Sequence, residues 1–263
     1  MRVAVTGAAG RIGRILCSGL VDGFEVVPVV RRPGVPGATV ADLSDVDALT
    51  SAFDGCDALV HLAGEATTNA PWERVLDANV IGVWNAFTAA RRAGIRRVVF
   101  ASSNHVVGMF EAEAGPRLHE LSDPRQVDHR AEVRADSLYG VSKAFGEVLA
   151  RYHVDQLGME VICLRIGSVV DALDPDVASP GMDVWSLTPP EEVTRLRATW
   201  LSHADTIRLV SAALRTPTTW AVVYGTSANP RQIWDLEHAR TAIGYVPVDA
   251  APDRLWAQSS EGD

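Results

Sequence analysis

The chain has 263 residues, 47% of them hydrophobic and 22% charged, so it is long enough to bury a full core and too apolar to be disordered. Its net charge of -9 argues against a surface for nucleic acid or an anionic membrane, because both need clustered positive charge. No apolar run approaches the roughly 20 residues that are needed to span a bilayer.

Short β-branched runs alternate with longer helical patterns along the chain. We predict strands over residues 2–6, 25–30, 58–63, 97–102, 160–166 and 221–224, and helices over 11–20, 72–94, 137–157, 191–200 and 205–214. The strands are near-continuous apolar runs, which is typical of a parallel sheet buried on both faces. This order predicts an α/β fold, a doubly wound parallel sheet of the Rossmann type. Residues 1–7 predict a strand that enters a glycine turn, so we do not expect a signal peptide.

Residues 6–13 read Thr-Gly-Ala-Ala-Gly-Arg-Ile-Gly, directly after the first strand and at the start of a helix. Glycines allow the tight turn and let backbone N–H groups approach a pyrophosphate at the helix N-terminus. A plain strand–turn–helix would also explain the glycines, but their position favours a dinucleotide. We expect cofactor contacts from Gly7, Gly10, Arg11, Ile12 and Gly13.

The second strand ends in Val29-Val30-Arg31-Arg32-Pro33, without the acid that an NAD site places on the ribose 2′-hydroxyl. Guanidinium groups suit a 2′-phosphate instead, by charge and by bidentate geometry. We therefore expect NADP to be favoured, with NAD as the alternative in which Arg31 and Arg32 are solvated charges.

The chain has 24 basic residues, and Lys143 is the only lysine among them. It follows Tyr139 by four residues, so the two side chains share one helix face. A nearby ammonium lowers the pKa of a phenol, which lets the phenolate accept a proton. We predict that Tyr139 and Lys143 are catalytic; the alternative is an exposed lysine beside a core tyrosine.

Two further polar sites follow from the pattern. Residues 100–108 leave a strand end with Ser-Ser-Asn-His, where a hydroxyl can hold a substrate oxygen beside Tyr139, although strand-end serines commonly bond their own turn. Asn79 lies within a predicted helix, where asparagine is disfavoured, so either a polar role or a solvent-facing position is open.

With these stretches, the chain resembles an extended short-chain dehydrogenase/reductase of the NAD-dependent epimerase/dehydratase family. Within that superfamily it is most similar to the uronate dehydrogenases. The matching stretches are T-G-A-A-G-R-I-G at 6–13, H-L-A-G at 61–64, N-V-I-G at 79–82, F-A-S-S-N-H-V-V-G at 100–108, Y-G-V-S-K-A-F-G-E at 139–147, L-R-I-G-S at 164–168, R-L-R-A-T-W-L-S-H at 195–203 and G-T-S-A-N at 225–229.

The resemblance implies oxidation of C1 of a pyranose uronic acid, or a related aldose, to a lactone, with hydride passing to NAD(P)+. It implies that Tyr139 is the base, Lys143 its partner and ribose ligand, and Ser103 the hydroxyl beside the reacting oxygen. Further cofactor contacts are expected from Asp42, Leu43, Leu62, Ala63, Asn79 and Ile166. Substrate contacts are expected from Ala66, Ser103, Asn104, His105, Tyr139, Ser168 and Arg195.

Among these, Arg195 is expected to clamp the uronate carboxylate, and Arg197 is expected to face solvent. Three features depart from the family pattern. Arg31 replaces an acid, Ala66 stands beside Thr67 where a substrate-contacting serine is usual, and residues 169–194 form a longer segment than the family has. The segment over 169–190 holds four Pro and four Asp and predicts a long loop.

We expect residues 1–167 to form the dinucleotide-binding core and residues 168–263 a small substrate-binding cap that is not an independent domain. Two alternatives stay open: a nucleotide-sugar epimerase, dehydratase or reductase of the same fold, and a non-catalytic dinucleotide-sensing regulator. The expected partner is a small sugar or sugar acid, with a homo-oligomer as an open expectation. The cysteines Cys17, Cys56 and Cys163 lack metal-ligand spacing, which predicts no metal site and reduced, buried thiols in a cytoplasmic protein.

Overall fold

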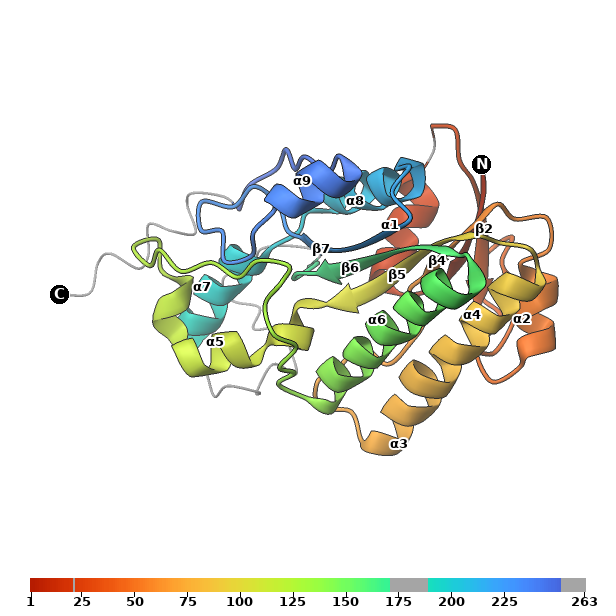
Figure 1. The fold of residues 1–263 in the computed structure, drawn as a ribbon, viewed down its shortest axis with the longest axis horizontal. Coiled ribbons are helices and arrows are strands. Elements are labelled where there is room, and N and C mark those ends of the chain that lie inside the picture. Colours follow the sequence, from red (N-terminus) through yellow and green to blue (C-terminus); the bar gives the residue numbers. More distant parts are fainter. Residues whose placement is uncertain (21, 171–188, 252–263) are drawn as a thin grey trace.

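The structure is a computed structural model, and it describes residues 1–20, 22–170 and 189–251. The described strands form one parallel sheet in the order β3-β2-β1-β4-β5-β6-β7 (Figure 1). Their bounds are β1 Arg2–Thr6, β2 Glu25–Val30, β3 Thr39–Val40, β4 Ala58–His61, β5 Arg97–Ser103, β6 Glu160–Ile166 and β7 Trp220–Gly225. The predicted doubly wound α/β fold is confirmed. The order of the strands reverses between β1 and β4, which is where an open α/β sheet forms a crevice at the carboxyl ends of its strands.

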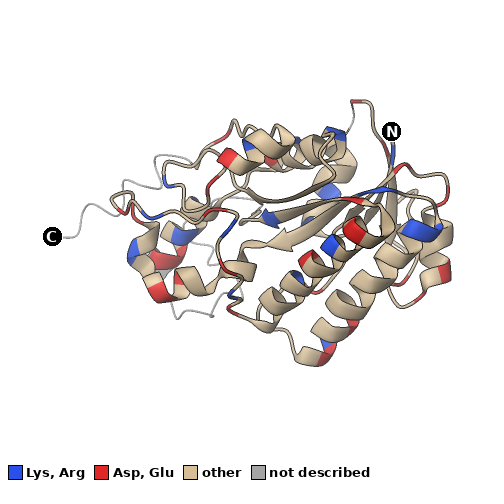
Figure 2. Ribbon diagram, viewed as in Figure 1, with Lys and Arg blue, Asp and Glu red and all other residues tan. Residues whose placement is uncertain are grey.

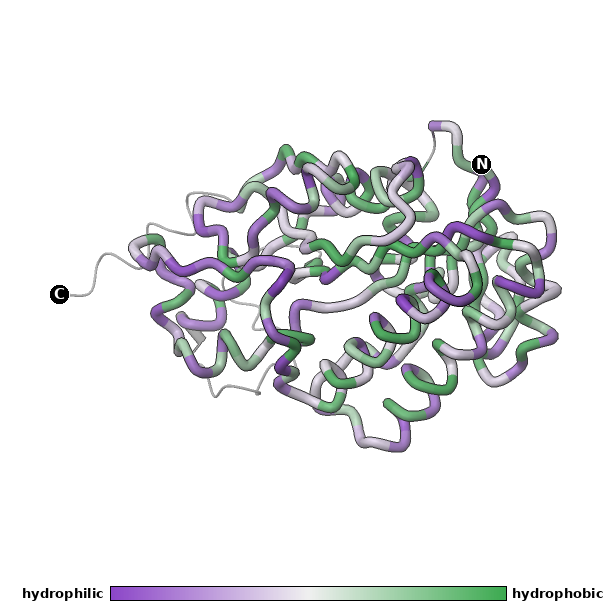
Figure 3. The backbone as a smooth tube through the Cα atoms, viewed as in Figure 1, coloured by the Kyte–Doolittle hydropathy of each residue, from purple (hydrophilic) through white to green (hydrophobic). Residues whose placement is uncertain are grey.

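Helices cover both faces of the sheet (Figure 1). One face packs against α1 Arg11–Gly19, α8 His203–Arg215 and α9 Glu237–Ile243. The other packs against α2 Val46–Ala52, α4 Gly82–Arg92 and α6 Leu138–Leu157. The hydropathy colours follow this arrangement, with hydrophobic strands between the helices (Figure 3). Burial on two faces explains why the strand sequences are continuous apolar runs.

The predicted helix over residues 72–94 has the right extent but a different interior. It consists of α3 Trp72–Val75, a π-helical segment η1 over Leu76–Ile81, and α4. Asn79 lies in η1 and is buried, and its amide exchanges hydrogen bonds of 2.7 and 2.9 Å with the backbone N–H and C=O of Glu65. Asn79 therefore has a polar role within the protein and does not face solvent.

A second group of short elements covers the carboxyl end of the sheet. These are the 3₁₀ turns η2 Asn104–Val107 and η3 Pro116–His119, and the helices α5 Met109–Ala114 and α7 Pro189–Thr199. They surround a hydrophobic cluster that includes Val107, Leu118 and Trp234. The sequence patterns did not predict α2, α5 or α9, and most of the predicted loop over 169–190 lies outside the described residues.

Two of the three cysteines are buried, as predicted. Cys56 and Cys163 are buried free thiols, whereas Cys17 is only half-buried, so its predicted burial is wrong. None of the helices in the described ranges is long and apolar enough to cross a membrane. Basic and acidic residues are interspersed along the chain (Figure 2).

Candidate active site

A cleft of about 860 Å³ lies at the carboxyl ends of the strands. Loops that follow β1, β2, β4, β5 and β6 line it, as expected for an open α/β sheet. The predicted site residues in its lining are Gly7, Gly10, Arg11, Ile12, Gly13, Arg31, Leu43, Leu62, Ala63, Ala66, Ser103, Asn104, His105, Tyr139, Lys143, Ile166 and Ser168. Four others are not among the described lining residues, namely Arg32, Asp42, Asn79 and Arg195.

The glycine loop needs glycine at two positions for steric reasons. Gly7 has a φ of +71°, and a Cβ there would lie 2.8 Å from the backbone nitrogen of Ala63. A Cβ on Gly13 would lie 2.3 Å from the carbonyl oxygen of Gly7. Gly10 is the N-cap of α1 and gives no side-chain hydrogen bond to the first turn. The first N–H groups of α1 therefore remain suited to a bound phosphate.

The charged residues near the glycine loop have different environments. Arg11 donates from Nη1 to the carbonyl oxygen of Val169 at 2.8 Å, which ties the glycine loop to the segment after β6. Arg31 lines the cleft at the end of β2. Asp42 accepts hydrogen bonds from the N–H and hydroxyl of Ser44, which, with Arg31 as a smaller cause, lower the pKa of its carboxyl. Of the two arginines after β2, Arg31 lines the described cleft and Arg32 does not.

Helix α6 approaches β5 closely because two glycines face that side. A Cβ on Gly140 would lie 2.4 Å from the carbonyl oxygen of His105, and one on Gly146 would lie 2.3 Å from the Phe100 ring. The hydroxyl of Ser137 accepts a hydrogen bond from the Gly140 N–H at 3.1 Å and caps the helix. This close packing brings the first turns of α6 to the end of β5.

Tyr139, Lys143 and Ser103 meet at that point. The Lys143 Nζ donates to the carbonyl oxygen of Ala101 at 2.8 Å and lies 5.6 Å from the centroid of the Tyr139 ring. Burial lowers the pKa of Lys143 to about 8. Burial also raises the pKa of Tyr139, against a hydrogen bond from Ser103 that lowers it. The sequence argument that the phenol pKa is lowered is therefore wrong for the protein alone, because burial is the larger effect.

The cleft lining near Tyr139 also contains the polar residues His105 and Ser168. His105 packs edge-on against the Tyr139 ring with a centroid distance of 5.8 Å, and its Nδ1 lies 2.7 Å from Oδ2 of Asp136. Ser168 and Thr199 share a hydrogen bond of 2.8 Å between their hydroxyls. The predicted substrate residues Ser103, His105 and Ser168 thus lie at one end of the cleft.

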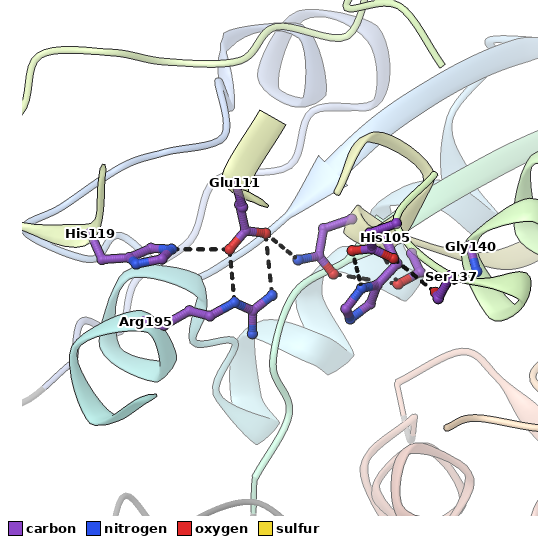
Figure 4. Close-up of polar contacts among 9 residues, drawn as sticks. His105, Glu111, His119, Ser137, Gly140 and Arg195 are labelled. Carbon is purple, nitrogen blue, oxygen red and sulfur yellow. Dashed lines mark hydrogen bonds and ion pairs between the residues drawn. The ribbon is translucent and has the colours of Figure 1, made fainter. Parts of the chain in front are cut away.

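Arg195 has a partner that the sequence did not predict. Its side chain is 1% exposed, and its guanidinium forms a bidentate ion pair with Glu111, with Nε–Oε2 at 2.8 Å and Nη2–Oε1 at 3.2 Å (Figure 4). Its neighbour Leu196 lines the cleft instead. Arg197 is 3% exposed, so the expectation that it faces solvent is wrong.

Glu111, which the sequence analysis did not single out, contacts three other polar side chains. Its Oε1 also accepts from the Asn104 side-chain amide at 3.2 Å, and its Oε2 lies 3.0 Å from His119 Nε2 (Figure 4). Burial raises the pKa of the Glu111 carboxyl, but Arg195 and His119 outweigh it and lower the value to about 2. Since Glu111 and Arg195 are 84 residues apart, no local pattern links them.

The described residues contain no group of three potential metal ligands. A glycine loop, a tyrosine and a lysine line one cleft at the carboxyl ends of the strands, which fits a nicotinamide-dependent dehydrogenase. The chain belongs to the NAD dependent epimerase/dehydratase family, whose model matches residues 3–179. The family predicted from the sequence is thereby confirmed.

The chain is similar over nearly its whole length to known dehydrogenases. It is 40% identical to L-arabinose 1-dehydrogenase (NAD(P)(+)) of Haloferax volcanii, over 94% of this chain and 96% of that protein. It is 36% identical to a uronate dehydrogenase of Agrobacterium fabrum, over 95% and 85% of the two chains. The crystal structure of uronate dehydrogenase from Agrobacterium tumefaciens has a TM-score of 0.80 at 33% identity and covers 100% of this chain and 90% of that one. A mutant of that enzyme complexed with NAD has the same values.

Proposed function

We propose that the protein oxidises the C1 hydroxyl of a pyranose sugar or sugar acid to a lactone, with NAD(P)+ as the acceptor. The observation that carries this proposal is the meeting of Tyr139, Lys143 and Ser103 at the end of β5, inside the cleft that the glycine loop opens. The similarity to L-arabinose and uronate dehydrogenases supports the same reaction.

When bound, the nicotinamide supplies the acceptor for the hydride from C1. The N–H groups after Gly10 suit the pyrophosphate of the dinucleotide. The lack of a Cβ at Gly7 and Gly13 allows the close backbone packing of this loop. Lys143 suits a ribose hydroxyl because its ammonium is a compact donor. Arg31 suits a 2′-phosphate, which favours NADP+ over NAD+.

The protein's part in the reaction is to hold and deprotonate the sugar. Ser103 donates a hydrogen bond to the C1 oxygen, and the Tyr139 phenolate takes the C1 hydroxyl proton. As that O–H bond breaks, the C1 hydride leaves and the C1–O bond becomes the lactone carbonyl. The Lys143 ammonium stabilises the phenolate, whose pKa burial alone would keep high. Asn104, His105 and Ser168 hold the sugar hydroxyls, and Ala66 leaves room beside them.

Tyr139→Phe tests this mechanism. We expect kcat to fall by about 10²–10⁴-fold, because the general base is lost, while the dissociation constant for NADP+ stays the same. Steady-state assays that follow the reduced nicotinamide with L-arabinose and D-galacturonate measure the first, and calorimetric titration measures the second. Tyr152→Phe is the matched control, since Tyr152 lies on the same helix and is 49% exposed. Full activity of Tyr139→Phe would remove Tyr139 as the base.

A further inference from the structure

The Glu111 carboxylate occupies the Nε–Nη2 edge of Arg195, one of the two edges by which a guanidinium binds a carboxylate. The Nε and Nη2 atoms of the guanidinium already bind both oxygens of Glu111 (Figure 4). This fork-to-fork geometry is the strongest way for arginine to bind a carboxylate. Both side chains are 1% exposed, so the pair lies within the protein beside the cleft.

Displacing Glu111 would be costly for the protein. Its oxygens also receive hydrogen bonds from Asn104 and His119, so a rival carboxylate has four contacts to replace. The displaced Glu111 would be a buried carboxylate that lacks its partner. The lowered pKa of Glu111 keeps it ionised at neutral pH, so protonation does not relieve the repulsion between two carboxylates.

The other basic residues of the described cleft lining have other positions or partners. Arg74 is ion-paired with Glu65. Arg11 donates to the backbone of Val169. Arg31 follows β2, three strand positions from β5, which is about 14 Å at the usual strand spacing. Lys143 stands at the phenol that we propose as the base. The sequence of residues 171–188, outside the described ranges, contains neither lysine nor arginine.

We propose that Glu111 acts as an internal substitute for a substrate carboxylate on Arg195, so that this site selects a neutral aldose over a uronic acid. This inference rests on the proposed C1 oxidation and names its substrate class. Glu111 also orients the cleft side chain of Asn104, because the amide nitrogen bonds Oε1 while Oδ1 accepts from Ser103 at 3.4 Å. Asn104 thus presents its acceptor oxygen toward the reacting end, where sugar hydroxyls donate.

The first test compares sugars that differ only at C5. L-Arabinose, D-galactose and D-galacturonate share one ring configuration and carry H, CH₂OH and COO⁻ there. We expect kcat/KM of the wild-type protein with NADP+ to be at least about tenfold lower for D-galacturonate than for the better neutral sugar. Equal or better use of D-galacturonate would overturn the inference and leave the proposed C1 oxidation intact. Failure of all three sugars, and of D-glucose and D-glucuronate, would instead contradict the proposed function and the inference with it.

The second test removes the internal carboxylate charge. Glu111→Gln removes the negative charge at the Nε–Nη2 edge of Arg195, so we expect the ratio of kcat/KM for D-galacturonate to that for the neutral sugar to rise about tenfold or more. The ratio is the readout because a general loss of structure lowers both rates together. Glu113→Gln is the matched control: Glu113 lies on the same helix and pairs with Arg134 at the surface, so the ratio should not change. An unchanged ratio in a folded Glu111→Gln protein would overturn the role of Glu111. If that variant does not fold, the wild-type comparison decides.

Discussion

Lys143 is buried, and burial lowers the pKa of its ammonium to about 8. With a pKa near 8 it is still mostly protonated at neutral pH, and it lies beside a phenol whose pKa burial raises. We propose that the ammonium and the positive charge of the oxidised nicotinamide, when bound, together bring the phenolate into the working pH range.

At the residue scale, we propose that Arg31 sets the cofactor preference. We expect Arg31→Glu to raise KM for NADP+ by about tenfold or more and to leave KM for NAD+ within about twofold, because a carboxylate repels the 2′-phosphate and accepts a ribose hydroxyl. Initial rates with both cofactors measure this. Arg32→Glu changes the same charge one residue away, outside the described cleft lining, and should have little effect. Equal effects of the two substitutions would show that Arg31 is a solvated charge.

Single residues differ in how far the sequence reveals them. The glycine loop and the Tyr139–Lys143 pair are local patterns, so spacing alone predicted their place in the cleft. Glu111 and Asp136 are joined to Arg195 and His105 only by tertiary packing. For this reason the sequence did not predict the ion pair of Arg195, and the predicted exposure of Arg197 was wrong, since nothing near either residue in the sequence shows what it packs against.

At the scale of elements, the glycine loop is fixed by backbone contact. We expect Gly13→Ala to destabilise the cofactor-free protein by about 1–3 kcal/mol, because the new Cβ would meet the Gly7 carbonyl and Ala8. Gly10→Ala is the control, since its Cβ would lie 3.1 Å from the Gly7 carbonyl oxygen. Urea unfolding of both variants without cofactor measures the difference. Equal stability of the two would show that the loop adjusts to a side chain at Gly13.

The Glu111 pair joins α5 to α7, with His119 of η3 alongside. The pKa of the Glu111 carboxyl is about 2 in the folded protein, against an ordinary value of 4.5. The ionised carboxylate therefore stabilises the folded protein fully above pH 4.5, and this stabilisation is lost as the pH falls toward 2. We expect Glu111→Gln to lower the free energy of unfolding by about 3–5 kcal/mol near neutral pH.

The difference in unfolding free energy between wild type and Glu111→Gln should shrink below about pH 4.5, where the carboxyl of the unfolded wild-type chain becomes protonated. Urea unfolding at a series of pH values measures it, with Glu113→Gln as the exposed control, for which solvent screening predicts a small effect. A difference between wild type and Glu111→Gln that is constant with pH would contradict the ion pair.

Elements with a strong apolar pattern were predictable, and short ones were not. The buried strands β4, β5 and β6 follow from their continuous apolar runs. Helices α5 and α9 have six and seven residues and too few turns for periodicity to appear. Asn79, in the π-helical segment, bonds the backbone of Glu65, 14 residues away, and no helical pattern encodes such a contact.

On the scale of the whole molecule, the sheet order brings distant parts of the sequence to one cleft. The glycine loop follows β1 and the Tyr139–Lys143 pair lies at the end of β5, so the cleft extends across the point between β1 and β4 where the strand order reverses. The predicted division at residue 167 remains a prediction. Strand β7 pairs with β6 in the same sheet, so the segment after residue 167 contributes to the sheet as well as to the cleft.

The most direct test of the account follows the hydrogen on C1 of the sugar. L-Arabinose deuterated at C1 is incubated with the protein and NADP+, and the products are examined by NMR and mass spectrometry. We predict that deuterium appears at C4 of the reduced nicotinamide in equal amount to the lactone formed, because the hydride leaves C1 for a cofactor that is then released. Sugar turnover that leaves deuterium on the sugar, or that forms no lactone, would contradict C1 oxidation and favour chemistry in which the cofactor is retained.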